Sequence, residues 1–223
     1  MNKFLDKFID LFKWPIAFYM LLSTPAICSS FHIFKVVNIN SISLFTGLVF
    51  FVFSKVMMDP SVRTSMQVIA HELTHTFFAF LTFHKVSNIR IHPDDTGGEM
   101  VFQGKGNWLI IIAPYFFPLF CVIYMCLMNF LPSQFVFHFI LGYFLGYHID
   151  TVCSQIHPEQ TDLQKVGYVF SFIFLPGINL LTIGSILAFN LKGLRGILDY
   201  FLLINQINMD YLINIKELIL SLL

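Results

Sequence analysis

Long apolar runs separated by short polar connections cover almost the whole chain. The candidate runs are residues 14–31, 42–58, 64–84, 108–131, 135–155 and 163–190. Each run approaches the roughly 20 residues that an α-helix needs to cross the hydrocarbon core of a bilayer. The pattern therefore predicts an all-α polytopic membrane protein with about six transmembrane helices.

Both ends of the chain have a different pattern. Within residues 1–13, phenylalanine recurs at every fourth position among lysines and aspartates, which predicts a helix at the membrane interface. Residues 196–223 are apolar, but polar side chains interrupt them between positions 205 and 210. A seventh span would have to bury these side chains, so we expect interfacial or packed short helices there. The whole chain, 1–223, is then a single membrane-embedded domain with its core at residues 64–190.

A short strand-like pattern follows residue 84. Residues 86–92 and 99–103 are strand-like, and the segment 93–98 between them is rich in Pro, Asp and Gly. This combination predicts one β-hairpin directly after the helix 64–84. We interpret the acidic residues Asp94 and Asp95 as turn formers in preference to metal ligands, because Asp and Gly before a strand usually make a turn.

Prolines give further local detail. Asp59, Pro60 and Ser61 form a helix-start signal just before the helix 64–84. Pro114 and Pro118 lie inside the apolar run 108–131, so we expect that span to bend.

Composition agrees with a membrane location and excludes other classes. The chain is 57% hydrophobic and only 12% charged, with 28 Phe, and its mean hydropathy is +0.74. A soluble domain of 223 residues could not bury so much apolar surface. The formal net charge is zero and no basic run occurs, so nucleic acid is not expected as a partner. The four cysteines form no CxxC pair and are interpreted as buried small hydrophobic residues.

The candidate chemistry is concentrated in the sequence HELTH at positions 71–75, inside the run 64–84. Residues four apart on a helix share one face, so His71 and His75 lie together. Two imidazoles in this arrangement can bind one zinc ion, and Glu72 is close enough to act on water at the metal. Burying a carboxylate at the centre of a membrane costs about 2.5–3.5 kcal/mol. This cost disfavours the alternative of a polar cluster that only stabilises helix packing.

A catalytic zinc site needs a third protein ligand and leaves its fourth position open. Among the acidic residues of the second half of the chain, only Asp150 and Asp162 lie inside or at the mouth of a predicted span. Asp162 follows Pro158 by four residues, in the opening turns of a span, where unpaired backbone donors can hold a carboxylate. Asp150 lies deeper in its span, where it is either the alternative third ligand or a partner that orients a ligand imidazole.

Together, HELTH in a membrane helix, the hairpin, the proline-bent span and a later aspartate resemble the site-2 protease family of intramembrane zinc metalloproteases. More narrowly, the chain resembles its small bacterial branch without a regulatory domain. The resemblance covers about residues 65–182, and HELTH is its only specific motif.

The resemblance implies a role for each candidate residue. His71, His75 and Asp162 are expected to bind zinc, and Glu72 is expected to act as the general base. The chain departs from the family pattern at one point, because the usual distal motif is an Asp-Gly pair and Leu163 follows Asp162 here.

These observations predict a membrane-embedded endopeptidase with one Zn²⁺ per chain. Its substrates would be transmembrane proteins or membrane-associated peptides, and its location the bacterial cytoplasmic membrane. One alternative is a non-proteolytic metal-binding membrane protein, a transporter or sensor with the same ligands, in which Glu72 is dispensable. The other is a scaffold with a structural polar cluster, which would bind no stoichiometric zinc.

Overall fold

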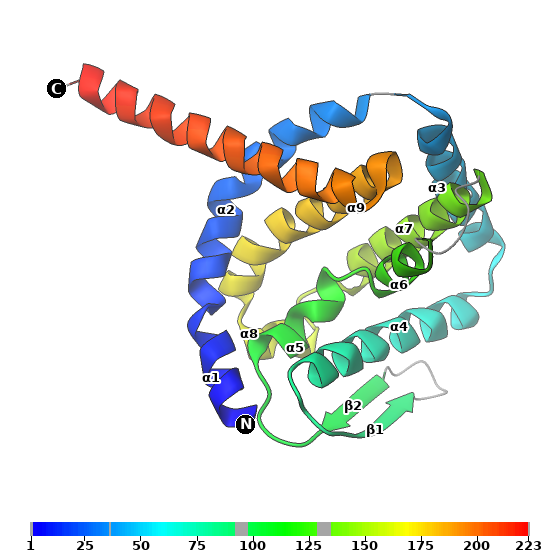
Figure 1. Cartoon of the computed structure of the whole chain (residues 1–223). Helices are drawn as coiled ribbons and strands as arrows, with labels where there is room; N and C mark the ends of the chain where they lie inside the picture. Colours follow the sequence, from blue (N-terminus) through cyan, green and yellow to red (C-terminus); the bar gives the residue numbers. More distant parts are fainter. Residues whose placement is uncertain (1, 36, 92–97, 129–134, 223) are drawn as a thin grey trace.

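The computed structural model describes residues 2–35, 37–91, 98–128 and 135–222 (Figure 1). The elements in chain order are α1 (Asn2–Leu11), α2 (Lys13–Ser30), η1 (Phe31–Lys35), α3 (Ile39–Met57), α4 (Pro60–Leu81), β1 (Val86–Ile91), β2 (Gly98–Phe102), α5 (Trp108–Ile112), η2 (Ala113–Tyr115), α6 (Leu119–Met128), α7 (Phe135–Gln155), α8 (Thr161–Val166) and α9 (Tyr168–Ser221). The predicted class, an all-α membrane protein with one short β-hairpin, is confirmed.

Within the described residues, four helices are long and apolar enough to cross a membrane. They are α1 with α2, then α3, α7 and α9, and a bent pair built from α5, η2 and α6 brings the number to five. This makes the protein an integral, multi-pass membrane protein. The sequence predicts about six spans because it counts the motif helix α4 as well. α4 is not among the candidates, and polar residues of the HELTH segment interrupt its apolar sequence.

The proline-bent span is confirmed. Trp108–Tyr115 and Leu119–Met128 meet at 80°. Pro114 lies in η2 and Pro118 immediately precedes α6. A proline ring removes one backbone donor and clashes with the preceding turn, so the chain cannot continue as one straight helix through both positions.

The hairpin lies along α4 (Figure 1). β1 and β2 pair antiparallel, with Ile89 opposite Met100. Residues 93–97 of the predicted turn, including Asp94 and Asp95, lie outside the described residues, and Gly98 is the first residue of β2. α4 itself starts where the sequence predicts, because the Asp59 side chain accepts a hydrogen bond from the backbone N–H of Ser61.

Two pairs of helices pack closely, α3 against α7 and α2 against α9. Glycines allow α3 and α7 to approach with their backbones almost in contact. A Cβ atom on Gly47 would lie 1.9 Å from the carbonyl oxygen of Phe139, and one on Gly142 would lie 1.9 Å from that of Leu44. Any larger side chain at either position would force these helices apart.

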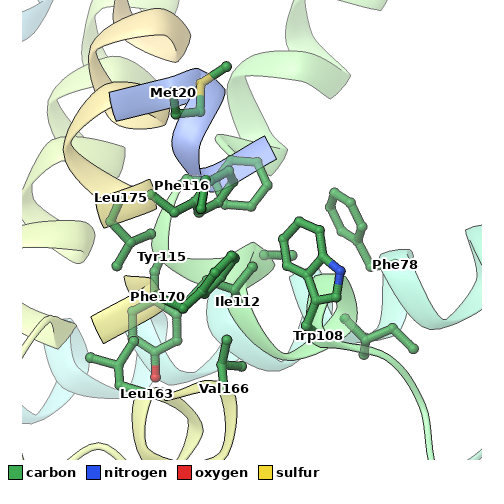
Figure 2. Close-up of a cluster of buried hydrophobic side chains, with 14 of the residues drawn as sticks. Met20, Phe78, Trp108, Ile112, Tyr115, Phe116, Leu163, Val166, Phe170 and Leu175 are labelled. Carbon is green, nitrogen blue, oxygen red and sulfur yellow. The ribbon is translucent and has the colours of Figure 1, made fainter. Parts of the chain in front are cut away.

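An aromatic core joins α5, α8 and the start of α9 (Figure 2). The ring centroids of Trp108 and Phe170 are 5.1 Å apart, in an edge-to-face arrangement. Leu163 and Val166 of α8 are buried in the same cluster. A helix of six residues is not stable by itself, so this packing is what fixes α8 in place.

The C-terminal segment differs from the expected short helices. After a break at Lys192 and Gly193, α9 continues as one helix to Ser221. No proline and no glycine follows Gly196, so nothing in the sequence interrupts this helix. Its polar residues face α2 in part, since the Asn208 amide donates to Ser23 Oγ at 3.1 Å. A location at the membrane interface stays a prediction for this segment and for α1.

Candidate metal centre

The histidines of the HELTH sequence lie on one face of α4, as their spacing predicts. Both side chains are buried, and their Nε2 atoms are 3.0 Å apart. The two rings meet edge to face, with centroids 4.6 Å apart. Tyr115 of η2 packs against the His71 ring from another side, at 5.3 Å between centroids.

Asp162 completes a group of three. Its Oδ2 atom lies 3.4 Å from His71 Nε2 and 3.1 Å from His75 Nε2. In the described part of the chain, these three residues are the group of His, Cys, Asp or Glu side chains whose atoms are close enough to share one metal ion.

The position of Asp162 comes from its own short helix and not from the start of a span. Asp162 is the second residue of α8, which begins at Thr161, whereas the span α9 begins only at Tyr168. Gly167 separates the two helices with φ +101°, a conformation that favours glycine. Leu163, the residue that stands where the family has glycine, packs into the aromatic core and anchors α8.

The second nitrogen of each imidazole is held by an acceptor. His71 Nδ1 donates to Gln155 Oε1 at 2.8 Å, and His75 Nδ1 donates to the carbonyl oxygen of Ile110 at 2.7 Å. The amide nitrogen of Gln155 supports this orientation of the side chain, because Gln155 Nε2 donates to the carbonyl oxygen of Gln67 at 3.3 Å. A proton on each Nδ1 leaves the lone pair of each Nε2 directed at the shared position.

The donor set fits a zinc ion. Two imidazole lone pairs and one carboxylate oxygen, separated by 3.0–3.4 Å, repel one another unless a cation or proton lies among them. Ligands at about 2.0–2.1 Å from a tetrahedral zinc are themselves about 3.3 Å apart. The observed separations match this value, and the hydrogen-bonded Nδ1 atoms are typical of metal-ligating histidines.

The Asp162 carboxyl remains ionised in this setting. Burial alone raises its pKa, but when no metal is bound and the imidazoles are protonated on Nε2 as well, the hydrogen bonds and charges of His71 and His75 outweigh burial and bring the pKa well below its ordinary value. Lys165 Nζ lies 3.2 Å from Asp162 Oδ1, the oxygen that is turned away from the histidines. The carboxylate therefore keeps one oxygen for the metal and one for a surface ion pair.

Glu72 is buried beside the histidines but is not one of the three grouped residues. β2 lies directly against it. A Cβ atom on Gly98 would be 2.8 Å from Glu72 Cγ and 3.1 Å from Glu72 Oε1. The absence of a side chain at Gly98 is what allows the strand to approach this carboxylate.

A cleft of about 780 Å³ is lined by residues of α4, β2, α5 and α8. Its lining includes Glu72, both histidines of the motif and Asp162. The described strand residues that line the cleft all belong to β2, and they are Gly98, Glu99, Met100 and Phe102. The unpaired edge of the two-stranded sheet therefore lies at the cleft, next to the candidate general base.

The structure does not bring Asp150 to the histidines. Asp150 forms an ion pair with Lys55 and accepts a hydrogen bond from Gln67 Nε2 at 3.0 Å. Gln67 also accepts, through its backbone carbonyl, the hydrogen bond from Gln155. Asp150 thus reaches His71 only through two glutamines.

Sequence reasoning missed three of these contributors, namely Gln155, Ile110 and Gly98. A glutamine at the end of an apolar helix and a glycine in a strand carry no metal-site signal by themselves. The carbonyl of Ile110 could not have been found from residue type, since every residue has one.

Comparison with known families matches residues 41–147 to the family described as Peptidase M50B-like. The matched region contains α4 with all of HELTH, the hairpin and most of α7, and it ends before Gln155 and Asp162. No curated protein matches, and no solved structure matches. The resemblance to the site-2 protease family is confirmed by the family match.

Proposed function

Because residues 41–147 match the Peptidase M50B-like family, we propose that this chain is a zinc-dependent endopeptidase embedded in the membrane. One observation carries the proposal. Three acceptor atoms from His71, His75 and Asp162 converge within 3.4 Å of one another, in the cleft that Glu72 also lines.

The residues have separate chemical roles in this proposal. His71, His75 and Asp162 would hold the zinc ion, which would supply the Lewis acidity that activates water and polarises the scissile carbonyl. Glu72 accepts the proton of the attacking water and then donates it to the nitrogen of the leaving amine. Glu72 lies beside the three proposed ligands but is not grouped with them, so its position suits a general base better than a fourth ligand.

The edge of β2 is the proposed substrate-binding element. A helical substrate shields its own peptide bonds, whereas an extended segment that adds to a strand edge exposes them. The edge of β2 lines the cleft, and Gly98 lies against Glu72. A substrate strand added there would lie next to the base and the metal ligands.

The substrates in this proposal are transmembrane proteins or membrane-associated peptides. The four to five candidate spans place the centre in a membrane protein. By its likeness to the small bacterial branch of the family, we assign the chain to the bacterial cytoplasmic membrane, with lipid as its surroundings and no nucleic-acid partner.

The first test measures zinc per chain in purified wild type and in the His75→Ala variant. We expect about one zinc ion per wild-type chain and its loss in the variant. A wild-type protein without stoichiometric zinc would contradict the proposal and support a scaffold with a structural polar cluster.

The second test separates a peptidase from a transporter or sensor. Glu72→Gln keeps the shape of the side chain but cannot accept a proton, so it should retain zinc and lose cleavage of membrane-protein substrates in proteoliposomes. Full activity of this variant, or loss of its zinc, would exclude the assigned role. Glu159→Gln, an equivalent change at the cleft lining, is the matched control and should keep both properties.

A further inference from the structure

We infer that Asp6 of α1 is a positioning residue for the metal centre, which it holds through α5 and through the base of the hairpin. The inference rests on the proposed function, since it concerns the same centre. Asp6 lies 69 positions before His75 and belongs to a helix that the sequence predicts only as a membrane-interface element. The structure gives this helix a second role on its inner side.

Asp6 is buried and receives two hydrogen bonds from distant parts of the chain. His84 Nε2 lies 3.2 Å from its Oδ2 atom, and Asn107 Nδ2 donates to its Oδ1 atom at 2.8 Å. All three residues are at most 9% exposed. A buried carboxylate is costly unless donors surround it, so these two partners help to hold α1 in place, together with the hydrogen bond from Trp108 Nε1 to the Ile9 carbonyl oxygen.

One path leads from Asp6 to the metal ligand His75. Asn107 caps α5, because its Oδ1 atom accepts from the backbone N–H of Ile110 at 3.2 Å. The carbonyl oxygen of Ile110 in turn accepts from His75 Nδ1 at 2.7 Å. Asp6 thus orients Asn107, the cap residue of α5. The backbone of α5 in turn orients the imidazole of His75.

A second path leads to the hairpin. His84 lies between the end of α4 and β1, and Asn107 follows the hairpin immediately before α5. The two partners of Asp6 therefore flank the hairpin at both ends. The His84 ring also packs edge to face on Phe102 of β2, at 5.3 Å between centroids. Through these contacts Asp6 holds the base of the strand pair whose edge lines the cleft.

Asp10 provides a matched control on the same helix. Its carboxylate lies one turn further along α1 and is exposed, and its Oδ1 atom accepts a hydrogen bond from the backbone N–H of Trp108 at 3.3 Å, which an asparagine oxygen can also accept. Asp6→Asn and Asp10→Asn make the same chemical change four residues apart. Only the first removes a carboxylate that both His84 and Asn107 require.

The experiment measures zinc affinity by chelator competition and amide hydrogen exchange of residues 86–91 and 98–102 in the full chain. For Asp6→Asn we expect the zinc affinity to be about tenfold lower. This is the smallest loss typical of mutations in residues that support metal ligands without binding the metal. We also expect roughly tenfold faster exchange in the hairpin, because its base is released. Asp10→Asn should leave both quantities at the wild-type value.

Asn107→Ser supplies a second variant in case Asp6→Asn does not fold. Serine keeps the N-cap acceptor for α5 but loses the amide donor to Asp6. It should reproduce the loss of zinc affinity. The double variant should bind zinc no more weakly than the weaker-binding single variant, because both changes break the same path from Asp6 through Asn107 to His75.

Two results would overturn the inference. One is an Asp6→Asn protein that melts at a lower temperature while its zinc affinity and hairpin exchange stay at the wild-type values, which is a purely structural role. The other is an equal effect of Asp10→Asn. If the wild type binds no zinc, the proposed function fails instead, and hairpin exchange alone then still tests whether Asp6 holds the strands.

Discussion

The two sides of the candidate metal centre hold their histidines by different means. On the α7 side, His71 is bonded to a side chain, the amide of Gln155. On the α5 side, His75 is bonded to a main-chain carbonyl, that of Ile110. A side-chain partner can be replaced by mutation without moving the backbone, whereas a carbonyl can be removed only by displacing its helix. The α7 side is therefore adjustable by single substitutions, and the α5 side depends on how α5 is capped and packed.

The largest expected effect comes from Asp162, the proposed ligand that both sides share. Asp162→Asn removes the negative charge that lies 3.1 Å and 3.4 Å from the two Nε2 atoms. Zinc affinity should fall by more than about 100-fold, beyond the range for partners outside the ligand set. Chelator competition measures this loss. Retained zinc in Asp162→Asn together with its loss in Asp150→Asn would exchange the roles of the two aspartates.

The α7 side is tested at Gln155. Gln155→Leu leaves His71 Nδ1 without an acceptor, so zinc affinity should fall by about 10- to 100-fold. Gln155→Glu keeps an acceptor of similar length and should restore the affinity. The same chelator competition measures both variants. Equal losses in the Leu and Glu variants would show that the position matters for packing and not for the imidazole.

The hairpin on the α5 side is tested by proline. Neighbouring N–H groups of a strand point to opposite sides, and Gln103 N–H donates to the Lys85 carbonyl beside β1, so Phe102 N–H points to the free edge of β2. Pro at Phe102 removes this N–H, whereas Ala at the same position keeps it. The proline variant should show a KM about 3- to 10-fold higher than the alanine variant, which corresponds to one lost hydrogen bond with substrate. Steady-state cleavage of a membrane-protein substrate measures the difference. Equal KM values would identify the hairpin as a connector.

The smallest effect is expected at Asp150, which reaches His71 only through Gln67 and Gln155. Its ion pair with Lys55 is partly exposed, and such pairs contribute little. Asp150→Asn should lower zinc affinity by less than about fivefold. A loss as large as that of Gln155→Leu would mean that the two glutamines transmit the full effect, and that the α7 side extends to Asp150.

The sequence by itself determined the features that depend on neighbouring residues. The spacing of His71 and His75 places them on one face of any α-helix. The start of α4 at Asp59 and the bend at Pro114 and Pro118 follow from local backbone constraints. The class of the protein follows from apolar runs long enough to cross a bilayer.

Only the tertiary structure decided which distant residues meet at the centre. Asp150 and Asp162 are both plausible ligands in the sequence, and only the packing of α8 through Leu163 and Val166 brings Asp162 to the histidines. Gln155 acquires a role because α7 ends beside α4. These contacts join residues separated by more than 80 positions, and no local propensity encodes such a pairing, since it depends on how buried side chains from several helices fit together.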